Sequence, residues 1–288
     1  MKKLLILAAA CAAVLAGLVP SATAVTGNYQ KDFVHDYVGL LVFYTEPDAN
    51  GDIFSHRCSG TLISPTVVVT AGHCTEGVDE GRIYWAQSAA PNYSPTAFGG
   101  LGGDPTTGYP YADFGPPDTS TFSRADNYGF HNFAGFPNTR DAGVVVLDAP
   151  YTPPSGLFGQ LPTVGAIDTY AMRKKQDARF TISGYGLSDQ DPVPVSFRER
   201  LMATSYLVNN EAPITTYNLK TTANPSQGKG GTCNGDSGGP IFFQGTRIIA
   251  AVTSFGMNAQ CKGLDFSYRL DRSEVLSWIT NPNRPDAG

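Results

Sequence analysis

Glycine and proline interrupt this chain at short intervals, and their spacing limits the elements that it can form. The 288 residues include 32 glycines and 21 prolines, dispersed between short apolar runs. Such a pattern favours many short strands joined by turns. The sequence therefore predicts an all-β protein, built as a barrel or a sandwich.

The apolar runs predict where the strands lie. β-Branched residues are concentrated on both sides of Pro65, which indicates two strand pieces within residues 61–70. Only residues 271–280 have helical character, with an apolar stripe and Asp271 as a candidate N-cap. The other expected strands are residues 38–44, 144–147, 179–183, 241–243 and 248–254.

The first 24 residues are typical of a secretory signal. Two lysines precede an apolar run over residues 4–19, and Ala22-Thr23-Ala24 is a small-residue cleavage site. A retained membrane span is a competing interpretation, but the run is short for a bilayer and ends at Pro20. A lipoprotein anchored at Cys11 is another, although cleavage there would divide the apolar run. We expect a secreted protein with no membrane attachment after signal cleavage.

Net charge limits the expected partners, and chain length limits the number of domains. The formal net charge is −5 and basic runs are lacking, so nucleic acid is not an expected partner. Without its signal, the chain is long enough for one large β domain or two small ones. No metal and no cofactor is expected.

Two short stretches carry the chemistry. In Gly235-Asp236-Ser237-Gly238-Gly239-Pro240, a serine between glycines can project its hydroxyl from a tight turn toward neighbouring N–H groups. Far upstream, Thr70-Ala71-Gly72-His73-Cys74 supplies a histidine beside a cysteine. A serine hydroxyl is nearly unreactive at neutral pH and needs such a base. Together the two motifs point to nucleophilic catalysis by serine.

These motifs resemble those of the chymotrypsin/trypsin family of serine peptidases. The resemblance implies two antiparallel β-barrels, with the active site at their junction and a short C-terminal helix. Further segments carry it over nearly the whole chain after the signal: Cys58-Ser59-Gly60-Thr61-Leu62-Ile63, Asp141-Ala142-Gly143-Val144-Val145-Val146-Leu147 and Ile182-Ser183-Gly184-Tyr185-Gly186.

The resemblance also implies domain boundaries. The signal covers residues 1–24 and the peptidase domain residues 25–284. Within the domain, the first barrel spans about 25–155, the second about 156–270 and the C-terminal helix about 271–280. The expected division follows Pro153-Pro154, which lie among small residues.

By the same resemblance, three residues form a catalytic triad. Ser237 is the expected nucleophile, His73 the base, and Asp141 the group that orients the imidazole. Asp126 and Asp148 compete for the third role, but Asp141 directly precedes a buried strand, as the family requires. The backbone N–H groups of Gly235 and Ser237 are the expected oxyanion hole.

The substrate site is less clearly specified. Ser254, Phe255 and Gly256 resemble the family's edge strand, which pairs with an extended peptide. Gly231 corresponds to the floor of the primary pocket, where an acidic residue would imply cleavage after Arg or Lys. Because Gly231 is not acidic, an apolar or aromatic preference is favoured over a basic one. Asp265 is a candidate to reach the pocket from its other wall.

Four cysteines remain after the signal is removed, and spacing alone allows three pairings. The family resemblance selects Cys58–Cys74 and Cys233–Cys261. A zinc site is the alternative, but no pair has the Cys-x-x-Cys spacing.

Residues 84–140 are longer than the corresponding stretch of relatives and rich in Gly, Pro and aromatic residues. We favour a cover packed on the first barrel over a rim that shapes the substrate cleft.

Asp236 raises the question of activation. In many relatives a freed α-amine pairs with the aspartate that precedes the nucleophile. Signal cleavage after Ala24 would expose Val25-Thr26-Gly27-Asn28, which resembles the family's apolar-apolar-Gly-Gly start in two positions. Val25 is thus a candidate partner of Asp236. The alternative is an unrelated terminus, with Asp236 held by a side chain or by backbone donors.

The leading hypothesis is a secreted serine endopeptidase acting through an acyl-enzyme intermediate. A catalytically silent binding homologue and an esterase-like hydrolase are the alternatives. Expected partners are polypeptide substrates and protein inhibitors, and we expect a monomer.

Overall fold

The computed structural model describes residues 25–44, 54–78, 80–89, 118–173, 177–188, 198–209, 214–224 and 228–287. The expected signal, residues 1–24, lies outside these ranges. Within them, no helix has both the length and the apolar character needed to cross a bilayer.

Six antiparallel strands close the first barrel, in the order β3-β4-β5-β8-β7-β6. The expected break at Pro65 is confirmed, because β4 ends at Ser64 and β5 begins at Val67. The strands are β3 (Val38–Tyr44), β4 (Phe54–Ser64), β5 (Val67–Thr70), β6 (Glu80–Tyr84), β7 (Thr119–Asn127) and β8 (Gly143–Leu147).

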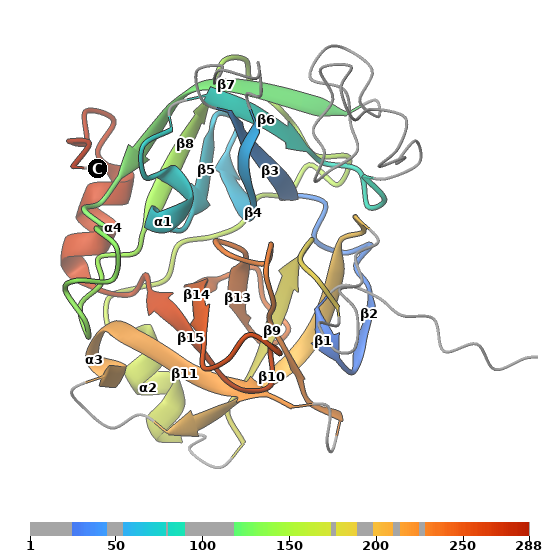
Figure 1. The fold of residues 1–288 in the computed structure, drawn as a ribbon, viewed down its shortest axis with the longest axis vertical. Helices are drawn as coiled ribbons and strands as arrows, with labels where there is room; N and C mark the ends of the chain where they lie inside the picture. Colours follow the sequence, from blue (N-terminus) through green and yellow to red (C-terminus); the bar gives the residue numbers. More distant parts are fainter. Residues whose placement is uncertain are drawn as a thin grey trace, which may run out of the picture.

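The second sheet has the order β11-β15-β14-β13-β9-β10-β2, and an additional β10–β11 pairing closes it into a barrel. Two antiparallel barrels were predicted, and the structure confirms them (Figure 1). The strands are β2 (Tyr29–Lys31), β9 (Arg179–Gly184), β10 (Leu201–Asn209), β11 (Asn218–Ala223), β13 (Pro240–Phe243), β14 (Ile249–Gly256) and β15 (Gly263–Arg269).

The beginning of the described chain belongs with the second barrel. Residues 25–155 were assigned to the first barrel, but β1 (Thr26–Gly27) pairs with β12 (Gly230–Gly231), and β2 pairs with β10. Val25 is fully buried and packs in the apolar cluster that contains Phe180 of β9. Burial of this apolar side chain favours the pairing that the structure shows.

Four short helices occur among the described residues. The expected C-terminal helix is confirmed as α4, which packs against the first barrel through Val275, Trp278 and Ile279 (Figure 1). The second barrel carries a helix, α2, that the sequence analysis did not predict. The helices are α1 (Gly72–Thr75), α2 (Ala166–Arg173), α3 (Ile214–Tyr217) and α4 (Ser273–Thr280).

Asp271 has a different role from the expected one. The N-cap of α4 is Arg272, without a side-chain capping bond. The Asp271 carboxylate instead pairs with Arg269 at 2.8 Å and accepts the N–H of Ile167 at 2.8 Å. Ile167 lies in the first turn of α2, so Asp271 satisfies a donor of a helix more than a hundred residues earlier in the chain.

Candidate active site

The pairing of β5 with β8 brings His73 and Asp141 together. Thr70 at the end of β5 lies opposite Gly143 at the start of β8, so the adjoining residues meet. The His73 ring Nδ1 is 3.1 and 3.0 Å from the two carboxylate oxygens of Asp141. The backbone N–H of His73 also donates to Asp141 Oδ1 at 2.7 Å. The carboxylate thus orients the ring and favours the tautomer with Nε2 as the acceptor.

Burial disfavours charge on both groups, but their mutual attraction outweighs it. For His73, burial lowers the pKa, but the charge and the hydrogen bond of Asp141 raise it by more. The pKa of His73 therefore lies above the usual 6.5. For Asp141, burial raises the pKa and His73 lowers it more, so the pKa lies below the usual 3.8. Asp141 is therefore an anion at neutral pH that stabilises a proton on the imidazole.

Ser254 links the second barrel to this pair. Its hydroxyl, at the end of β14, donates a short hydrogen bond to Asp141 Oδ2, and both side chains are buried. Sequence reasoning assigned Ser254 only to the substrate strand. The contact shows that it also holds the Asp141 carboxylate across the junction of the barrels.

Ser237 lies on a turn before β13 that is held against the end of β5. The N–H of Ser59 donates to the carbonyl of Ser237 at 2.7 Å. Gly238 has a φ of +74°, and a Cβ there would lie 2.7 Å from the nitrogen of Ala71, so only glycine allows this approach. Ala71 is two residues before His73. The described contacts include no hydrogen bond between Ser237 and His73.

The same turn presents two backbone donors. Gly235 has a φ of +96°, and its carbonyl accepts the Ser59 hydroxyl at 2.9 Å. Among the described residues, the N–H groups of Gly235 and Ser237 donate to no other protein group. Both expected oxyanion donors are therefore available to a bound oxygen.

Asp236 is buried and bound by backbone donors. Its two carboxylate oxygens accept the N–H of Gly186 at 2.8 Å and of Cys233 at 2.9 Å. Burial raises its pKa to about 7 despite these bonds and the charge of Arg57. The backbone donors match the alternative considered for Asp236, and they do not compensate fully for its loss of solvent.

Val25 lies in the same region of the second barrel. The strand that follows it pairs Thr26 with Gly231, and the Thr26 hydroxyl donates to the carbonyl of Cys261 at 3.4 Å. Val25 has a φ of +60°, an unfavourable conformation for a β-branched residue inside a chain. No described hydrogen bond joins Val25 to Asp236.

The structure places Asp265 at the predicted pocket floor. A Cβ on Gly231 would lie 3.1 Å from Asp265 Oδ2, and one on Gly256 would lie 3.7 Å from Oδ1. The same Oδ2 accepts the N–H of Thr232 at 2.6 Å. Burial raises the Asp265 pKa to about 7. The two predicted substrate-binding glycines therefore border one buried carboxylate.

Aromatic rings surround the predicted substrate strand. Phe255 stacks on Phe266 with centroids 4.8 Å apart, and Phe133 and Phe136 lie 5.4 and 6.2 Å from it. Phe133 also lies 6.2 Å from the His73 ring. A cover packed on the first barrel was favoured for residues 84–140. The described part of that segment supplies β7 to the first barrel and also places two exposed rings at the predicted substrate strand. Residues 90–117 lie outside the described residues, so the choice between a cover and a rim stays a prediction for them.

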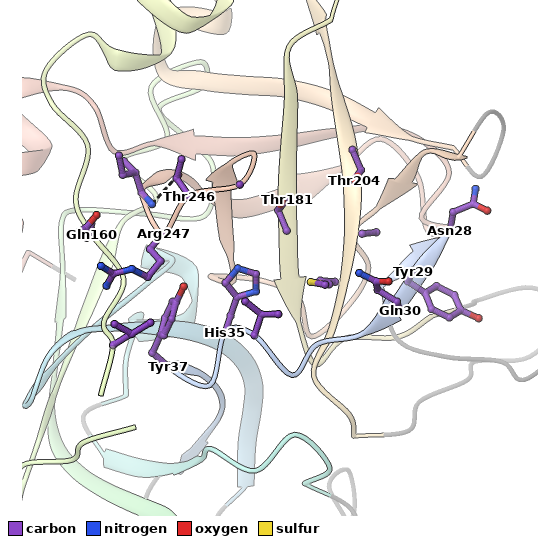
Figure 2. Close-up of a pocket in the computed structure, with 16 residues that line it drawn as sticks. Asn28, Tyr29, Gln30, His35, Tyr37, Gln160, Thr181, Thr204, Thr246 and Arg247 are labelled. Atoms are coloured by element: carbon purple, nitrogen blue, oxygen red, sulfur yellow. Dashed lines mark hydrogen bonds between the residues drawn. The ribbon is translucent and has the colours of Figure 1, made fainter. Parts of the chain in front are cut away.

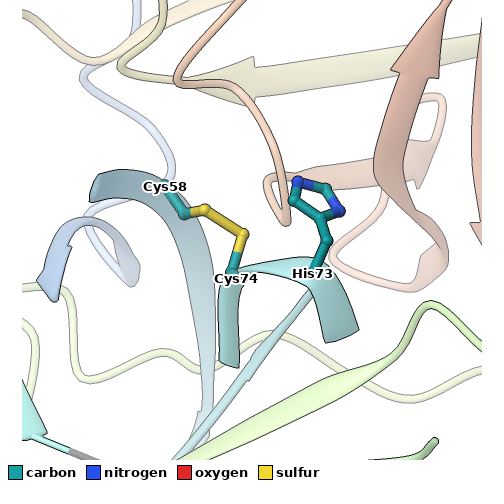
Figure 3. Close-up of side chains that lie close together, drawn as sticks. All are labelled: Cys58, His73 and Cys74. Carbon is teal, nitrogen blue, oxygen red and sulfur yellow. A yellow bond between two sulfur atoms is a disulfide. The ribbon is translucent and has the colours of Figure 1, made fainter. Parts of the chain in front are cut away.

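Both expected disulfides, Cys58–Cys74 and Cys233–Cys261, are present. Figure 3 shows the first beside His73, where two sulfurs and an imidazole form a cluster of metal-binding types. Because both sulfurs are in the disulfide, they offer no thiolate to a metal.

Comparisons with known proteins find similar sequences over most of the chain. A family model described as Trypsin matches residues 41–98 and 118–279. The chain is 27% identical to brachyurin of Leptuca pugilator, over 77% of this chain and 88% of that protein. It is 26% identical to submandibular glandular kallikrein-9 of Rattus norvegicus, over 77% and 79% of the two chains.

Solved structures share the fold. One described as HL collagenase has a TM-score of 0.59 and 16% identity, with 88% of this chain and 96% of that chain covered. Human heparin binding protein has a TM-score of 0.57 and 18% identity, with 90% and 99% covered.

Proposed function

The chain belongs to the trypsin family of serine proteases, and we propose that it is a secreted serine endopeptidase. The observation that carries this proposal is the His73–Asp141 pair, held beside the turn of Ser237. A buried carboxylate, an oriented imidazole, a serine hydroxyl and two backbone N–H donors on the same turn are the groups that acyl transfer needs.

In the proposed reaction, Ser237 Oγ attacks the carbonyl carbon of the scissile peptide while His73 Nε2 takes the hydroxyl proton. The carbonyl oxygen becomes an oxyanion and accepts the N–H groups of Gly235 and Ser237. His73 then gives its proton to the leaving amine, which leaves an acyl ester on Ser237. Water, deprotonated by His73, hydrolyses this ester and regenerates the serine.

We also propose that the enzyme cleaves after basic residues. This departs from the preference that Gly231 suggested. Asp265 supports it, because its carboxylate lies where a side chain of Gly231 would begin. A Lys or Arg side chain entering the pocket would meet a buried anion that lacks a cationic partner among the described residues.

Signal cleavage during the proposed secretion would also activate the enzyme. Cleavage after Ala24 would free the α-amine of Val25 and remove the strain of its positive φ. We propose that this amine pairs with Asp236, whose carboxylate is buried without full compensation. The proposed enzyme acts as a monomer on polypeptides and is open to protein inhibitors.

A silent binding homologue remains the second candidate, because one solved relative is named for binding heparin. An esterase-like hydrolase is the third. Labelling with an organophosphonate, read by intact mass, separates enzyme from silent binder. We expect one adduct on the wild type and none on Ser237→Ala, and an unlabelled, folded wild type would contradict the proposal.

A peptide library then separates peptidase from esterase. Cleavage after Lys or Arg is expected, and the loss of turnover in Ser237→Ala should reach about 10⁶-fold, because this change removes the nucleophile. Hydrolysis of small esters without cleavage of any peptide would favour the esterase.

A further inference from the structure

A cavity of about 840 Å³ lies on the second barrel, and none of its lining residues belongs to the proposed active site. It is bounded by β2, by β9 and β10, and by the turn between β13 and β14. Residues 157–160 border it from another side. Figure 2 shows Tyr37, His35 and Arg247 near one end and Asn28 and Tyr29 at the other. A volume of this order is typical of small-molecule sites.

The Tyr37 hydroxyl is a buried polar group without a hydrogen-bond partner. The residue is 1% exposed, and its oxygen makes no hydrogen bond to any residue that the structure describes. Figure 2 shows this oxygen directed between His35 and Arg247, on the cavity side. Burial raises the pKa of Tyr37 well above the usual 10, so the hydroxyl keeps its proton and can donate. An unmade bond of this kind is costly in a core, and a ligand acceptor would remove the cost.

Arg247 gives this end of the cavity a positive charge. Its Nη1 donates to the carbonyl of Phe158 at 2.6 Å, which leaves further guanidinium donors for a ligand. No Asp or Glu is among the described residues that line the cavity. The nearby Asp32 is fully buried, and its carboxylate accepts His35 Nδ1 at 2.8 Å and Ser183 Oγ at 2.6 Å. The Asp32 carboxylate is therefore bonded to these groups and is not paired with Arg247. The carboxylate of Asp36, whose charge also acts on Tyr37, accepts the N–H and the hydroxyl of Ser155 at 2.7 and 2.6 Å.

The lining presents more apolar than polar surface, although it includes the polar side chains of Asn28, Gln30, Gln160 and Thr246. Val34 and Leu157 are 60% and 42% exposed and offer apolar surface to a ligand in the cavity. Met202 and Ile248 add apolar surface. Thr181 and Thr204, paired across β9 and β10, add two hydroxyls. A ligand that fits this lining has one anionic group and an apolar body.

We propose that this cavity binds a carboxylate with an apolar body, held by the Arg247 guanidinium and the Tyr37 hydroxyl. The guanidinium fork matches a carboxylate, and the phenol donates to one of its oxygens. The carboxylate is either that of a free organic acid or the C-terminus of an apolar peptide. This inference does not depend on the proposed peptidase activity.

Calorimetric titration of Ser237→Ala protein tests the proposal, because bound peptides then stay intact. The probes are hexanoate, a hexapeptide ending in Leu-Val with a free carboxylate, the same peptide as its C-terminal amide, and inorganic phosphate. Binding of hexanoate supports a free acid as the source, and binding of the free peptide alone supports a C-terminus. Equal binding of the amide, equal binding of phosphate, or no binding of either carboxylate probe at millimolar concentration would overturn the proposal.

Two further substitutions in this background locate the site. Tyr37→Phe keeps the ring and should weaken carboxylate binding about tenfold without lowering the Tm, since the hydroxyl has no partner in the free protein. Arg247→Gln should weaken it about a hundredfold. Tyr151→Phe and Arg179→Gln, which lie outside the lining, are the matched controls. Unchanged affinity in both cavity variants would place the ligand elsewhere.

Discussion

At the scale of single residues, the proposed mechanism depends on how two carboxylates are buried. Asp141 is buried with His73, Ser254 and a backbone N–H around it, so it stays ionised. Asp265 is buried with a single described backbone donor, so its pKa rises to about 7. Both carboxylates are buried, but Asp141 stays charged at neutral pH, whereas the charge of Asp265 depends on pH near 7.

The first prediction concerns His73. Only the neutral imidazole accepts the serine proton, so kcat/KM for a small ester should rise with pH, with a midpoint above 6.5. Asp141→Asn should lower turnover about 10⁴-fold, because it favours the wrong tautomer. Stopped-flow assays between pH 5 and 9 measure both. A flat profile between pH 5 and 8 would exclude a histidine base.

The second prediction concerns Asp265. Its carboxyl is neutral below pH 7 and ionised above it, so the preference for basic over apolar substrates should grow through about pH 7. The ratio of the two kcat/KM values isolates this effect, because the titration of His73 cancels. Asp265→Asn should reduce kcat/KM for a Lys or Arg substrate by at least about 100-fold and make the ratio independent of pH. A pH-independent ratio in the wild type would contradict the proposed pocket.

At the scale of elements, the aromatic segment before β8 is the least expected part of the site. Phe133 and Phe136 are 38% and 51% exposed, yet both contact Phe255 of the predicted substrate strand. Exposed aromatic rings beside a peptide-pairing strand offer apolar contacts to substrate side chains.

The third prediction follows from this arrangement. Phe136→Ala should raise KM for a hexapeptide several-fold and leave kcat/KM for a small ester unchanged, because the described ring contacts of Phe136 are with Phe255 and not with His73. Val164→Ala, on another exposed loop and outside the cavity of the second barrel, serves as the control. An equal effect on both substrates would mean that Phe136 supports the fold and not the cleft.

Elements that depend on local pattern were predicted well, and those that depend on distant contacts were not. β3 has the expected bounds, because its apolar run ends at turn residues. Helix α2 was missed because a donor in its first turn is satisfied by Asp271, which no local pattern reveals. Asp265 could not be placed because the β14–β15 register shifts between Thr253 and Phe255, which disturbs any count along the chain.

At the scale of the whole molecule, the two ends of the chain join the barrels. β2 pairs with β10 of the second barrel and β1 pairs with β12 before the chain forms the first barrel, and α4 returns from the second barrel to pack on the first. The His73–Asp141–Ser254 contacts cross the same junction. A change at the beginning of the domain can therefore reach the active site through the second barrel.

The last prediction tests this link at Val25. In a chain that continues upstream of Val25, Asp236 has a pKa near 7, raised above its usual 3.8. A raised carboxyl pKa stabilises the fold below about pH 4, and this stability is lost as pH rises to 7. If the free amine of Val25 pairs with Asp236, the mature chain does not lose this stability.

A chain with one residue added before Val25 should then lose activity, and its deficit in unfolding free energy relative to the mature chain should grow between pH 4.5 and 8. Urea unfolding of both chains at the two pH values measures the difference, from which the shared effect of Asp265 cancels. Equal stability at pH 8 together with full activity would show that Asp236 needs only its backbone donors.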